Sequence, residues 1–537
     1  MPEDEPLLRK TGKGLNLFYG GSYLYSTVDP EGRAENRASN TTINEGTLVF
    51  IPSIGLGYGL NTILKKLPRD AHILCIEADE KLFKLALTLN PSRIPRDERI
   101  TVVRTTNPDS IRELLRRINL SALRRVSKVT LSKGYILYRQ LYDYIEDLLS
   151  EEIASYWQSR MTIIGMGNLW MRNILINLPH LGESYDIASI KLKSPAFVIG
   201  AGPSARDALP EILDFTENAV VIAVDSSLPL LCDINLKPDF IVTVDSQLTN
   251  LFDFLPCRFQ ESYVITDLSV NPNIFRLPER KYHFSFLSQF SYLGIFERLK
   301  KMDLLPSSIR PLGSVGNTAV HLANRVSNAP VITIGLDFSY TRGLTHSIGS
   351  AFHQSMLHSN NRFLPLELEN LNALFSRPRF IRKRKEHDKV ETDIVLDNFA
   401  NLFREMADKS GKIYSYRGTH ILDEAHEISN REELKNIIPG NRKNIEIERK
   451  SFDIESLGDF YHDEKRILAE AEKLIIDILE GDVSLTADVL NDRRLRDIDY
   501  TYFFFPDFRD GIPEKNRGFL ERILISARYF MKFLSTF

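Results

Sequence analysis

The sequence has few cysteines and no long apolar run. Of 537 residues only Cys75, Cys232 and Cys257 are cysteine, and their spacing excludes a Cys-x-x-Cys metal or redox motif. The longest apolar runs, such as residues 219–224, have the length of a strand and are much too short to cross a membrane. The first residues are acidic where a signal peptide would be basic. We therefore expect a reduced, cytoplasmic protein with no integral membrane segment.

An excess of charge of either sign is also absent. The 68 basic and 71 acidic side chains leave a formal net charge of −3, so no overall field would attract nucleic acid or an anionic membrane. The chain is longer than a single hydrophobic core accommodates, which indicates about two to four domains. With 43% hydrophobic and 26% charged residues, these should be ordinary globular domains without a nucleic-acid partner.

Strand and helix patterns predict an α/β protein of three domains. Residues 1–190 form a smaller, Rossmann-like α/β domain, with strands at 47–53 and 72–79. Residues 191–430 contain runs of Val and Ile separated by helix-length connections, which is typical of a Rossmann-like parallel sheet covered on both faces. Residues 431–537 lose the strand signal and contain long amphipathic segments, so we predict a helical C-terminal domain. The strands predicted in the central domain are 196–201, 219–225, 239–245, 263–267, 282–286 and 330–337.

A glycine-rich turn follows the first strand of the N-terminal domain. Gly55-Leu56-Gly57-Tyr58-Gly59 precedes Glu77, at the end of the next strand, by 22 residues. In a nucleotide-binding Rossmann unit such glycines let the backbone approach the ligand, and such an acid binds ribose hydroxyls. The spacing favours an S-adenosylmethionine site over a dinucleotide site, and a Rossmann unit with a purely structural role is the alternative. The segment that follows, residues 108–159, is predicted to be mostly helical.

A second turn, in residues 197–207, is a candidate phosphate site. Gly200 and Gly202 would permit positive φ and a close approach of the backbone, and Pro203 favours the start of a helix. Ser204 adds a hydroxyl beside the free N–H groups of that helix start, where a phosphate oxygen could bind. An ordinary strand-to-helix turn is the alternative.

Aspartates end four of the predicted central strands: Asp225, Asp245, Asp267 and Asp337. In open α/β sheets the ligand crevice lies outside the carboxyl ends of the strands, so these carboxylates should face it. Each one alone could instead cap the next helix or turn.

A third turn, Gly313-Ser314-Val315, precedes a helix and is a second candidate cradle for an anion or a sugar. The loop after the last predicted strand then supplies a cation, Arg342, and a histidine, His346, which could act as a general base. His353 and His358 lie in the same connection and are alternatives for that base.

Six of these segments, in order over roughly residues 195–420, resemble the central domain of the motility-associated-factor (Maf) glycosyltransferases, which modify flagellin. Two of them also resemble the "GNGPSL" turn and "GIDFY" strand end of bacterial sialyltransferases. The segments are GAGPS (200–204), VDSS (224–227), KPDFIVTVDSQ (237–247), GSVGNTAVHLA (313–323), VITIGLDFSY (331–340) and THSIG (345–349).

The resemblance implies transfer of a nonulosonic acid, of the pseudaminic or legionaminic type, from a CMP-activated donor to Ser or Thr of flagellin. For this reaction we assign His346 as the catalytic base and Asp245 as a second catalytic residue, which would contact ribose, base or sugar hydroxyls. Neither a cofactor nor a metal is implied, since the CMP-sugar is itself the substrate. The residues assigned to the donor nucleotide are Gly200, Gly202, Pro203, Ser204, Asp225, Gly313, Ser314, Val315 and Asp337.

Two segments depart from the patterns of those families, and a third, basic segment is interpreted separately. Ala201 stands where the sialyltransferase turn has Asn, so one polar contact to the donor is missing. Residues 411–424 lack the family pattern "N-x-T/S-E-G-G", which weakens inference about the acceptor. The basic run at 377–389 is interpreted as a lid or acceptor loop, with a solvated charged surface as the alternative.

Two other functions fit the sequence. Archaeal 6-hydroxymethylpterin pyrophosphokinases share a similar core, in which the aspartates would serve Mg²⁺. A non-catalytic flagellin-binding or assembly factor would tolerate the loss of Asn at position 201. The sequence leaves the oligomeric state open.

Overall fold

The computed structural model describes residues 5–89, 94–115, 117–255, 261–277, 283–288, 292–341, 343–383, 389–419, 421–422, 426–449, 451–481, 483, 486–508 and 516–537. The chain divides into two compact units. The first is Met1–Gly165 with Phe505–Pro513, and the second is Met166–Phe504 with Glu514–Phe537. The predicted boundaries at 190 and 430 both fall inside the second unit.

The first unit is built on a four-stranded parallel sheet in the order β6-β5-β4-β7. Its two central strands are buried on both faces and pack against two apolar clusters, as parallel strands do when helices cover the sheet. Residues predicted to be helical contain one of the strands, β7, which is short and carries two charged residues. The strands are β4 (Thr47–Pro52), β5 (His72–Glu77), β6 (Ile100–Arg104) and β7 (Arg125–Lys128).

Other elements of this unit surround that sheet. An antiparallel sheet precedes it, formed by β1 (Leu7–Thr11), β2 (Gly14–Tyr19) and β3 (Ser22–Tyr23). The connecting helices are α1 (Pro30–Asn40), α2 (Leu60–Lys66), α3 (Glu80–Leu89) and α4 (Pro108–Leu115). The 39-residue helix α5 (Arg139–Asn177) starts in this unit and ends in the second.

The second unit contains a nine-stranded sheet in the order β19-β18-β15-β10-β11-β12-β13-β14-β8, in which every neighbouring pair is parallel. The predicted Rossmann-like parallel sheet is thus confirmed. The strands are β8 (Ser184–Asp186), β10 (Ala196–Ile199), β11 (Val220–Val224), β12 (Phe240–Thr243), β13 (Tyr263–Asp267), β14 (His283–Phe286), β15 (Val331–Ile334), β18 (Ile413–Tyr416) and β19 (Glu427–Ile428).

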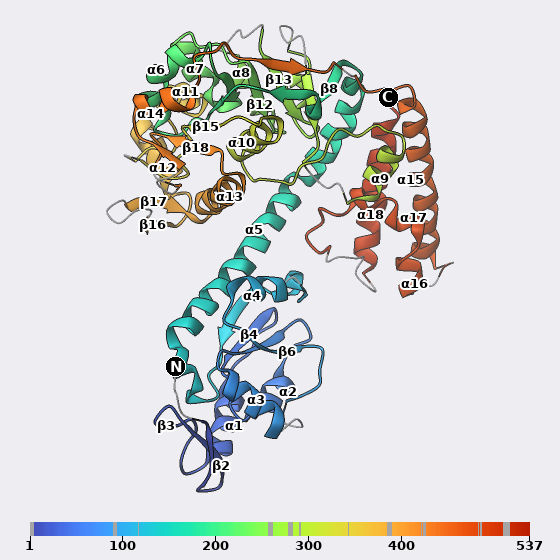
Figure 1. The fold of residues 1–537 in the computed structure, drawn as a ribbon. Coiled ribbons are helices and arrows are strands. Elements are labelled where there is room, and N and C mark those ends of the chain that lie inside the picture. Colours follow the sequence, from blue (N-terminus) through green and yellow to red (C-terminus); the bar gives the residue numbers. More distant parts are fainter. Residues whose placement is uncertain are drawn as a thin grey trace. The chain divides into compact units, whose positions relative to one another are not determined.

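Helices cover both faces of this sheet (Figure 1). On one face Val198 and Ile222 pack against α10 (Val315–Val326) and α13 (Ile394–Ser410). On the other, Phe197 and Val221 pack against α6 (Ala205–Ile212) and α7 (Leu228–Asp233). The strands are continuously apolar because side chains of alternating direction are buried on both faces. Smaller helices and a hairpin complete the fold: α8 (Leu251–Phe254), α11 (Ala351–Ser359), α12 (Leu366–Phe375), α14 (Arg431–Ile437), β16 (Arg379–Lys383) and β17 (Lys389–Asp393).

The order of strands reverses beside β10. From β10 the chain adds β11, β12, β13 and β14 on one side, and then returns to place β15 on the other side of β10. A reversal of this kind opens a crevice at the carboxyl ends of the two strands, where open α/β sheets bind their ligands. The loops that follow β10 and β15 are therefore the first place to look for a site.

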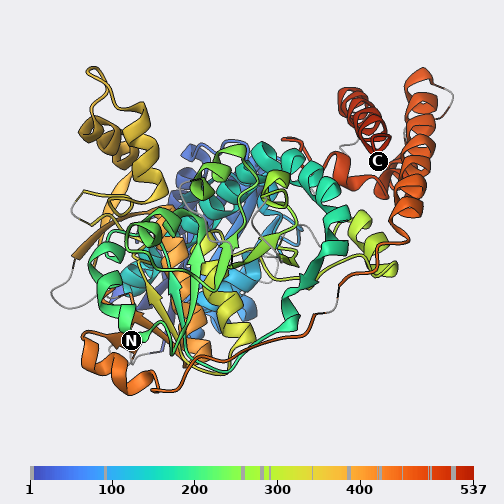
Figure 2. The same cartoon turned by 90° about the horizontal axis from the view of Figure 1, so that it is seen from above.

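The C-terminal part of the second unit is helical, as predicted. Helices α15 (Leu457–Glu480) and α18 (Arg517–Leu534) lie side by side, as Figure 2 shows, and α9 (Gly294–Lys301) packs on the same C-terminal part of the chain. A buried ion pair between Arg298 Nη2 and Glu464 Oε1, 2.7 Å apart, joins α9 to α15. Two short helices, α16 (Ala487–Leu490) and α17 (Arg493–Arg496), belong to the same group, whereas β20 (Ile445–Ile447) instead pairs with β9 (Ile190–Leu192). None of the described helices is both long and apolar enough to span a bilayer.

Candidate functional site

The turns after β10 and β15 are hydrogen-bonded to each other. The N–H of Gly200 donates to Ile334 O at 2.8 Å, and the N–H of Gly202 donates to Gly335 O at the same distance. The two predicted segments GAGPS and GLDF, which are far apart in the sequence, therefore lie side by side at the carboxyl ends of β10 and β15, where the strand order reverses.

Glycine is required in the first turn for a reason other than the one expected. Positive φ is found at Gly335 but not at Gly200 or Gly202, so the expectation of positive φ at the GAGPS glycines was wrong. The requirement is space: a Cβ at Gly200 or Gly202 would lie 2.5 or 2.7 Å from Gly335 O. Backbone packs on backbone here, and any side chain would separate the two loops.

Asp337 occupies the start of helix α6. Its Oδ2 accepts the N–H of Ser204 at 2.8 Å, and its backbone carbonyl accepts the hydroxyl of Thr419 at 2.7 Å. The next N–H, from Ala205, donates to Gly202 O at 3.0 Å, and Pro203 has no N–H to offer. A carboxylate oxygen thus already takes the N–H that we expected to bind a phosphate.

Helix α10 begins at the same edge of the sheet and offers a more open N-terminus. Gly313 has φ +76° and is exposed, Ser314 and Val315 are half-buried, and the first turn contains no acidic residue. The Ser314 hydroxyl caps the helix by accepting the N–H of Asn317 at 3.1 Å. A Cβ at Gly316 would lie 2.6 Å from Leu336 Cδ2, so α10 packs closely on the loop that follows β15. This 12-residue helix is better suited to a phosphate than α6.

Beside these turns, Asp225, Asp245 and Asp253 form an acidic cluster. Asp225 is only 3% exposed and accepts hydrogen bonds from Asn250 Nδ2 at 2.9 Å and the N–H of Ser226 at 2.7 Å. Asp245 is exposed and accepts the N–H of Gln247. Asp225 is therefore buried and held by protein hydrogen bonds, whereas Asp245 is accessible to a ligand. Sequence reasoning missed Asn250 and Asp253, which no strand-end pattern marks.

Burial and neighbouring carboxylates favour the protonated forms in this cluster. Burial raises the pKa of Asp225, against hydrogen bonds that favour its charged form. Burial, followed by the charges of Asp225 and Asp245, raises the pKa of Asp253 to about 7. The pKa of Asp253 thus lies near neutral pH, and an opposite charge placed beside it would lower that pKa.

We expect Asp253→Asn to stabilise the ligand-free protein at pH 8 by on the order of 2 kcal/mol and to change its stability little near pH 4. The folded-state pKa lies above the ordinary value of 3.8, so the contribution of Asp253 to stability is present below that value and is lost as the pH rises through about 7. Thermal unfolding of both proteins across this range measures the difference. An equal shift at every pH would contradict this titration.

The loops that carry Asp245 and Asp267 are held by two asparagines of α5. Asn173 Nδ2 donates to Ser246 O and Ser269 O, both at 3.0 Å. Asn177 donates in the same way to Leu268 O and Val270 O, both at 2.8 Å. Asp267 itself is fully buried and accepts the N–H groups of Ser269 and Ser288, so it closes the loops and does not face the crevice.

Among the three candidate histidines, His346 adjoins a residue that is hydrogen-bonded to the first glycine turn. The next residue, Ser347, donates its N–H to Ala201 O at 2.8 Å. Nδ1 of His346 is 3.3 Å from Thr345 Oγ1, its ring packs on Phe352, and burial lowers its pKa to about 4. His346 is therefore neutral at pH 7, and burial also makes it a weaker base than an ordinary imidazole.

The other two histidines have local partners. His353 Nδ1 accepts the N–H of Gly349 at 3.2 Å, and exposed His358 contacts Gln354 O on its own helix. Arg342, Cys257 and residues 384–388 of the basic run lie outside the described residues.

In the first unit, protein groups already occupy the hydrogen-bonding positions at the glycine-rich turn and at Glu77. Glu77 is fully buried and accepts hydrogen bonds from Ser53 Oγ at 2.9 Å, the N–H of Ile54 at 3.0 Å and Tyr142 OH at 3.2 Å. Tyr25 OH accepts the N–H of Leu56 at 2.7 Å, inside the turn. The acid expected to bind ribose is thus saturated by protein groups, and this geometry favours the structural alternative.

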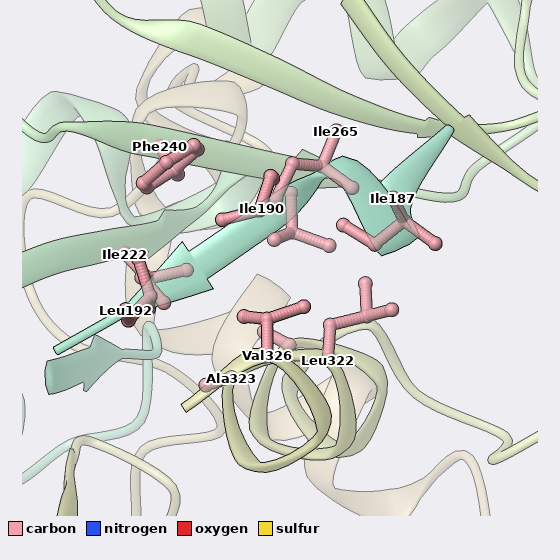
Figure 3. Close-up of a pocket in the computed structure, with 11 residues that line it drawn as sticks. Ile187, Ile190, Leu192, Ile222, Phe240, Ile265, Leu322, Ala323 and Val326 are labelled. Carbon is pink, nitrogen blue, oxygen red and sulfur yellow. The ribbon is translucent and has the colours of Figure 1, made fainter. Parts of the chain in front are cut away.

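One cavity lies beneath the sheet, between its strands and the second half of α10 (Figure 3). Its volume is about 10 Å³, barely enough for one water molecule, and every side chain that lines it is apolar. It is a packing void and not a ligand site. Its lining includes Ile187, Ile190, Leu192, Ile222, Phe240, Ile265, Leu322 and Val326.

Three similarities to known proteins bear on the site. Residues 172–343 match a family model described as 6-hydroxymethylpterin diphosphokinase MptE-like. The whole chain is 26% identical to an uncharacterized protein of Treponema pallidum (strain Nichols), of which it covers 96%. The structure of the Maf glycosyltransferase from Magnetospirillum magneticum AMB-1 matches with a TM-score of 0.54 and 13% identity, over 99% of this chain and 86% of that one.

The structural match extends over nearly the whole chain. The protein has the fold of a Maf glycosyltransferase. This finding confirms the predicted resemblance at the level of architecture, including the large parallel sheet and the helical C-terminal region. Within the Maf fold, the region that matches the MptE-like family contains strands β10 to β15, the reversal of strand order and the acidic cluster.

Proposed function

We propose that the protein is a glycosyltransferase that uses a nucleotide-activated sugar. In its specific form, it transfers a pseudaminic- or legionaminic-type acid from a CMP-activated donor to Ser or Thr of flagellin, in the cytoplasm. The observation that carries the proposal is the packing at the carboxyl ends of β10 and β15 in a chain with the Maf fold. There the turns after both strands are hydrogen-bonded to each other, the start of α10 packs on the loop after β15, and the residue after His346 is hydrogen-bonded to the first turn.

The arrangement suits the departure of a nucleoside monophosphate. As the bond to the sugar breaks, negative charge grows on the phosphate, and the N-terminal dipole of α10 at Gly313, Ser314 and Val315 would stabilise that charge. Asp245, which is exposed, would orient hydroxyl groups of the donor. His346, neutral at pH 7, would take the proton of the acceptor hydroxyl as the new bond forms.

A kinase of the 6-hydroxymethylpterin type is the second candidate, and the family-model match over residues 172–343 favours it. In that function carboxylate oxygens would hold Mg²⁺ on ATP, since these are the ligands that Mg²⁺ prefers. Against it, the described residues contain no group of three or more His, Cys, Asp or Glu side chains placed to hold a metal ion.

We expect CMP to raise the melting temperature of the protein more than UDP does. A ligand at 100 times its dissociation constant adds about 2.7 kcal/mol to the free energy of unfolding, which thermal unfolding detects easily. CMP, CDP, UDP and ATP with and without Mg²⁺ should be compared, followed by transfer from CMP-pseudaminic and CMP-legionaminic acid to purified flagellin. Stabilisation by ATP with Mg²⁺ alone would replace the glycosyltransferase by the kinase. No stabilisation by any nucleotide, with flagellin binding retained, would support the non-catalytic factor.

A further inference from the structure

Two buried serine hydroxyls beside the first glycine turn have no hydrogen-bond partner among the described residues. They belong to Ser204, in the turn itself, and to Ser347, which is 1% exposed. Buried polar groups in folded proteins are nearly always paired, and an unpaired one costs stability. Hydroxyls kept at this cost call for a partner that the described residues do not supply.

The backbone around Ser347 is fully engaged, which isolates the hydroxyl as the unexplained group. The N–H of Ser347 donates to Ala201 O at 2.8 Å, and its carbonyl accepts the N–H of Ser350 at 3.1 Å. These bonds fix Ser347 against the turn that contains Ser204. Ser350, three residues further on, has a conventional role, because its hydroxyl accepts the N–H of His353 and caps α11.

The chemistry of the surroundings indicates which part of a ligand would bind. Asp337 Oδ2 accepts the N–H of Ser204 at 2.8 Å, so this donor at the start of α6 is already paired and is not available to a phosphate. A ligand hydroxyl group, in contrast, can donate to a carboxylate and accept from a serine at the same time. The carboxylate of Asp337, together with the hydroxyls of Ser204 and Ser347 that are unpaired among the described residues, thus matches the hydrogen-bonding groups of a polyol.

We propose that Ser204 and Ser347, with Asp337, bind hydroxyl groups of the donor, either those of its ribose or those of its sugar. The assignment rests on the proposed function, and it places the sugar-nucleotide phosphate at α10 and a polyol at α6. No catalytic step is assigned to these serines.

The test is Ser347→Ala, with Ser350→Ala as the matched control. We expect Ser347→Ala to leave the melting temperature of the ligand-free protein unchanged or higher, since it removes an unpaired hydroxyl, and to weaken ligand binding by about 3- to 10-fold. Ser350→Ala removes a helix cap, so it should lower the melting temperature and leave affinity unchanged. Calorimetric titrations with CMP and with CMP-pseudaminic and CMP-legionaminic acid give the affinities.

The ligand series identifies the source of the hydroxyl groups. Weaker binding of CMP as well as of the CMP-sugars would place the ribose at Ser347, and weaker binding of the CMP-sugars alone would place the sugar there. Unchanged affinity for all of them, or a melting temperature lowered as in Ser350→Ala without loss of affinity, would overturn the proposal. If the wild-type protein binds ATP and not CMP, the proposed function fails, and the ribose assignment is then tested with ATP on the same variants. If it binds no nucleotide, both fail.

Discussion

Replacing Gly202 with valine is expected to abolish nucleotide binding and to destabilise the second unit. The first side-chain carbon alone would lie 2.7 Å from the carbonyl oxygen of Gly335, a backbone atom that cannot rotate away. It would also collide with the Asp337 carboxylate, which holds the N–H of Ser204. The loops after β10 and β15 would have to separate at the carboxyl ends of these strands.

Gly202→Ala provides the graded version of this change. One methyl group already produces the backbone collision, so we expect a loss of about 1–3 kcal/mol of stability together with reduced affinity. Gly440→Val is the control, because a Cβ at Gly440 would meet no atom within 4 Å. Thermal unfolding with and without CMP measures both effects. Normal folding and binding by Gly202→Val would show that the two loops do not need to pack so closely.

Replacing His346 with alanine is expected to lower the rate of sugar transfer by roughly two to four orders of magnitude and to leave nucleotide affinity nearly unchanged. The base acts on the acceptor hydroxyl, whereas donor binding depends on the turns and on α10. His346→Gln preserves more of the packing against Phe352, 4.7 Å away between ring centres, and should show the same loss. Transfer to flagellin and CMP affinity are measured separately for each variant.

Two further histidine variants separate catalysis from structure. His358→Ala, on the exposed side of α11, should leave both transfer and stability unchanged. His353→Ala removes the acceptor of the Gly349 N–H and should lower stability with transfer retained. Loss of transfer in His353→Ala with full activity in His346→Ala would move the base to His353.

The pH dependence offers an independent check on His346. Burial lowers its pKa to about 4, so the free protein carries an unprotonated base throughout the neutral range. The acid limb of kcat/KM, which reports ionisations of the free enzyme, should therefore lie near pH 4 and not near the ordinary value of 6.5. A limb near 6.5 that persists in His346→Gln would belong to another group.

Local sequence was sufficient for most of the central sheet. Runs such as residues 219–225 and 330–337 are apolar throughout, and only a strand buried on both faces demands this pattern. The pattern was insufficient at the edges. Strand β7 contains two charged residues in four, so its pairing with β4 is visible only in the structure. Strand β20 was likewise missed in a segment predicted to be helical.

The candidate site shows the same division at the level of single residues. The two glycine turns of the second unit, the strand-end aspartates and His346 were all named as candidates from the sequence, because each follows a recognisable strand or precedes a helix. The roles of these residues could not be predicted from the sequence. Asp267 had the same local pattern as Asp245, yet the first is buried under the N–H groups of Ser269 and Ser288 and the second is exposed.

Sequence by itself determined the elements, the turns and the resemblance to Maf glycosyltransferases, since these depend on residue types over short stretches. Only the tertiary structure decided which turn is open to an anion. Asp337 reaches Ser204 across 133 residues because β15 returns to pair with β10, and that pairing follows from the packing of whole layers. The resulting hydrogen bond takes up the N–H of Ser204 at the start of α6, whereas the first turn of α10 contains no acidic residue. The hydroxyls of Ser204 and Ser347 have no partner among the described residues. No local pattern contains such information, because it arises where distant segments meet.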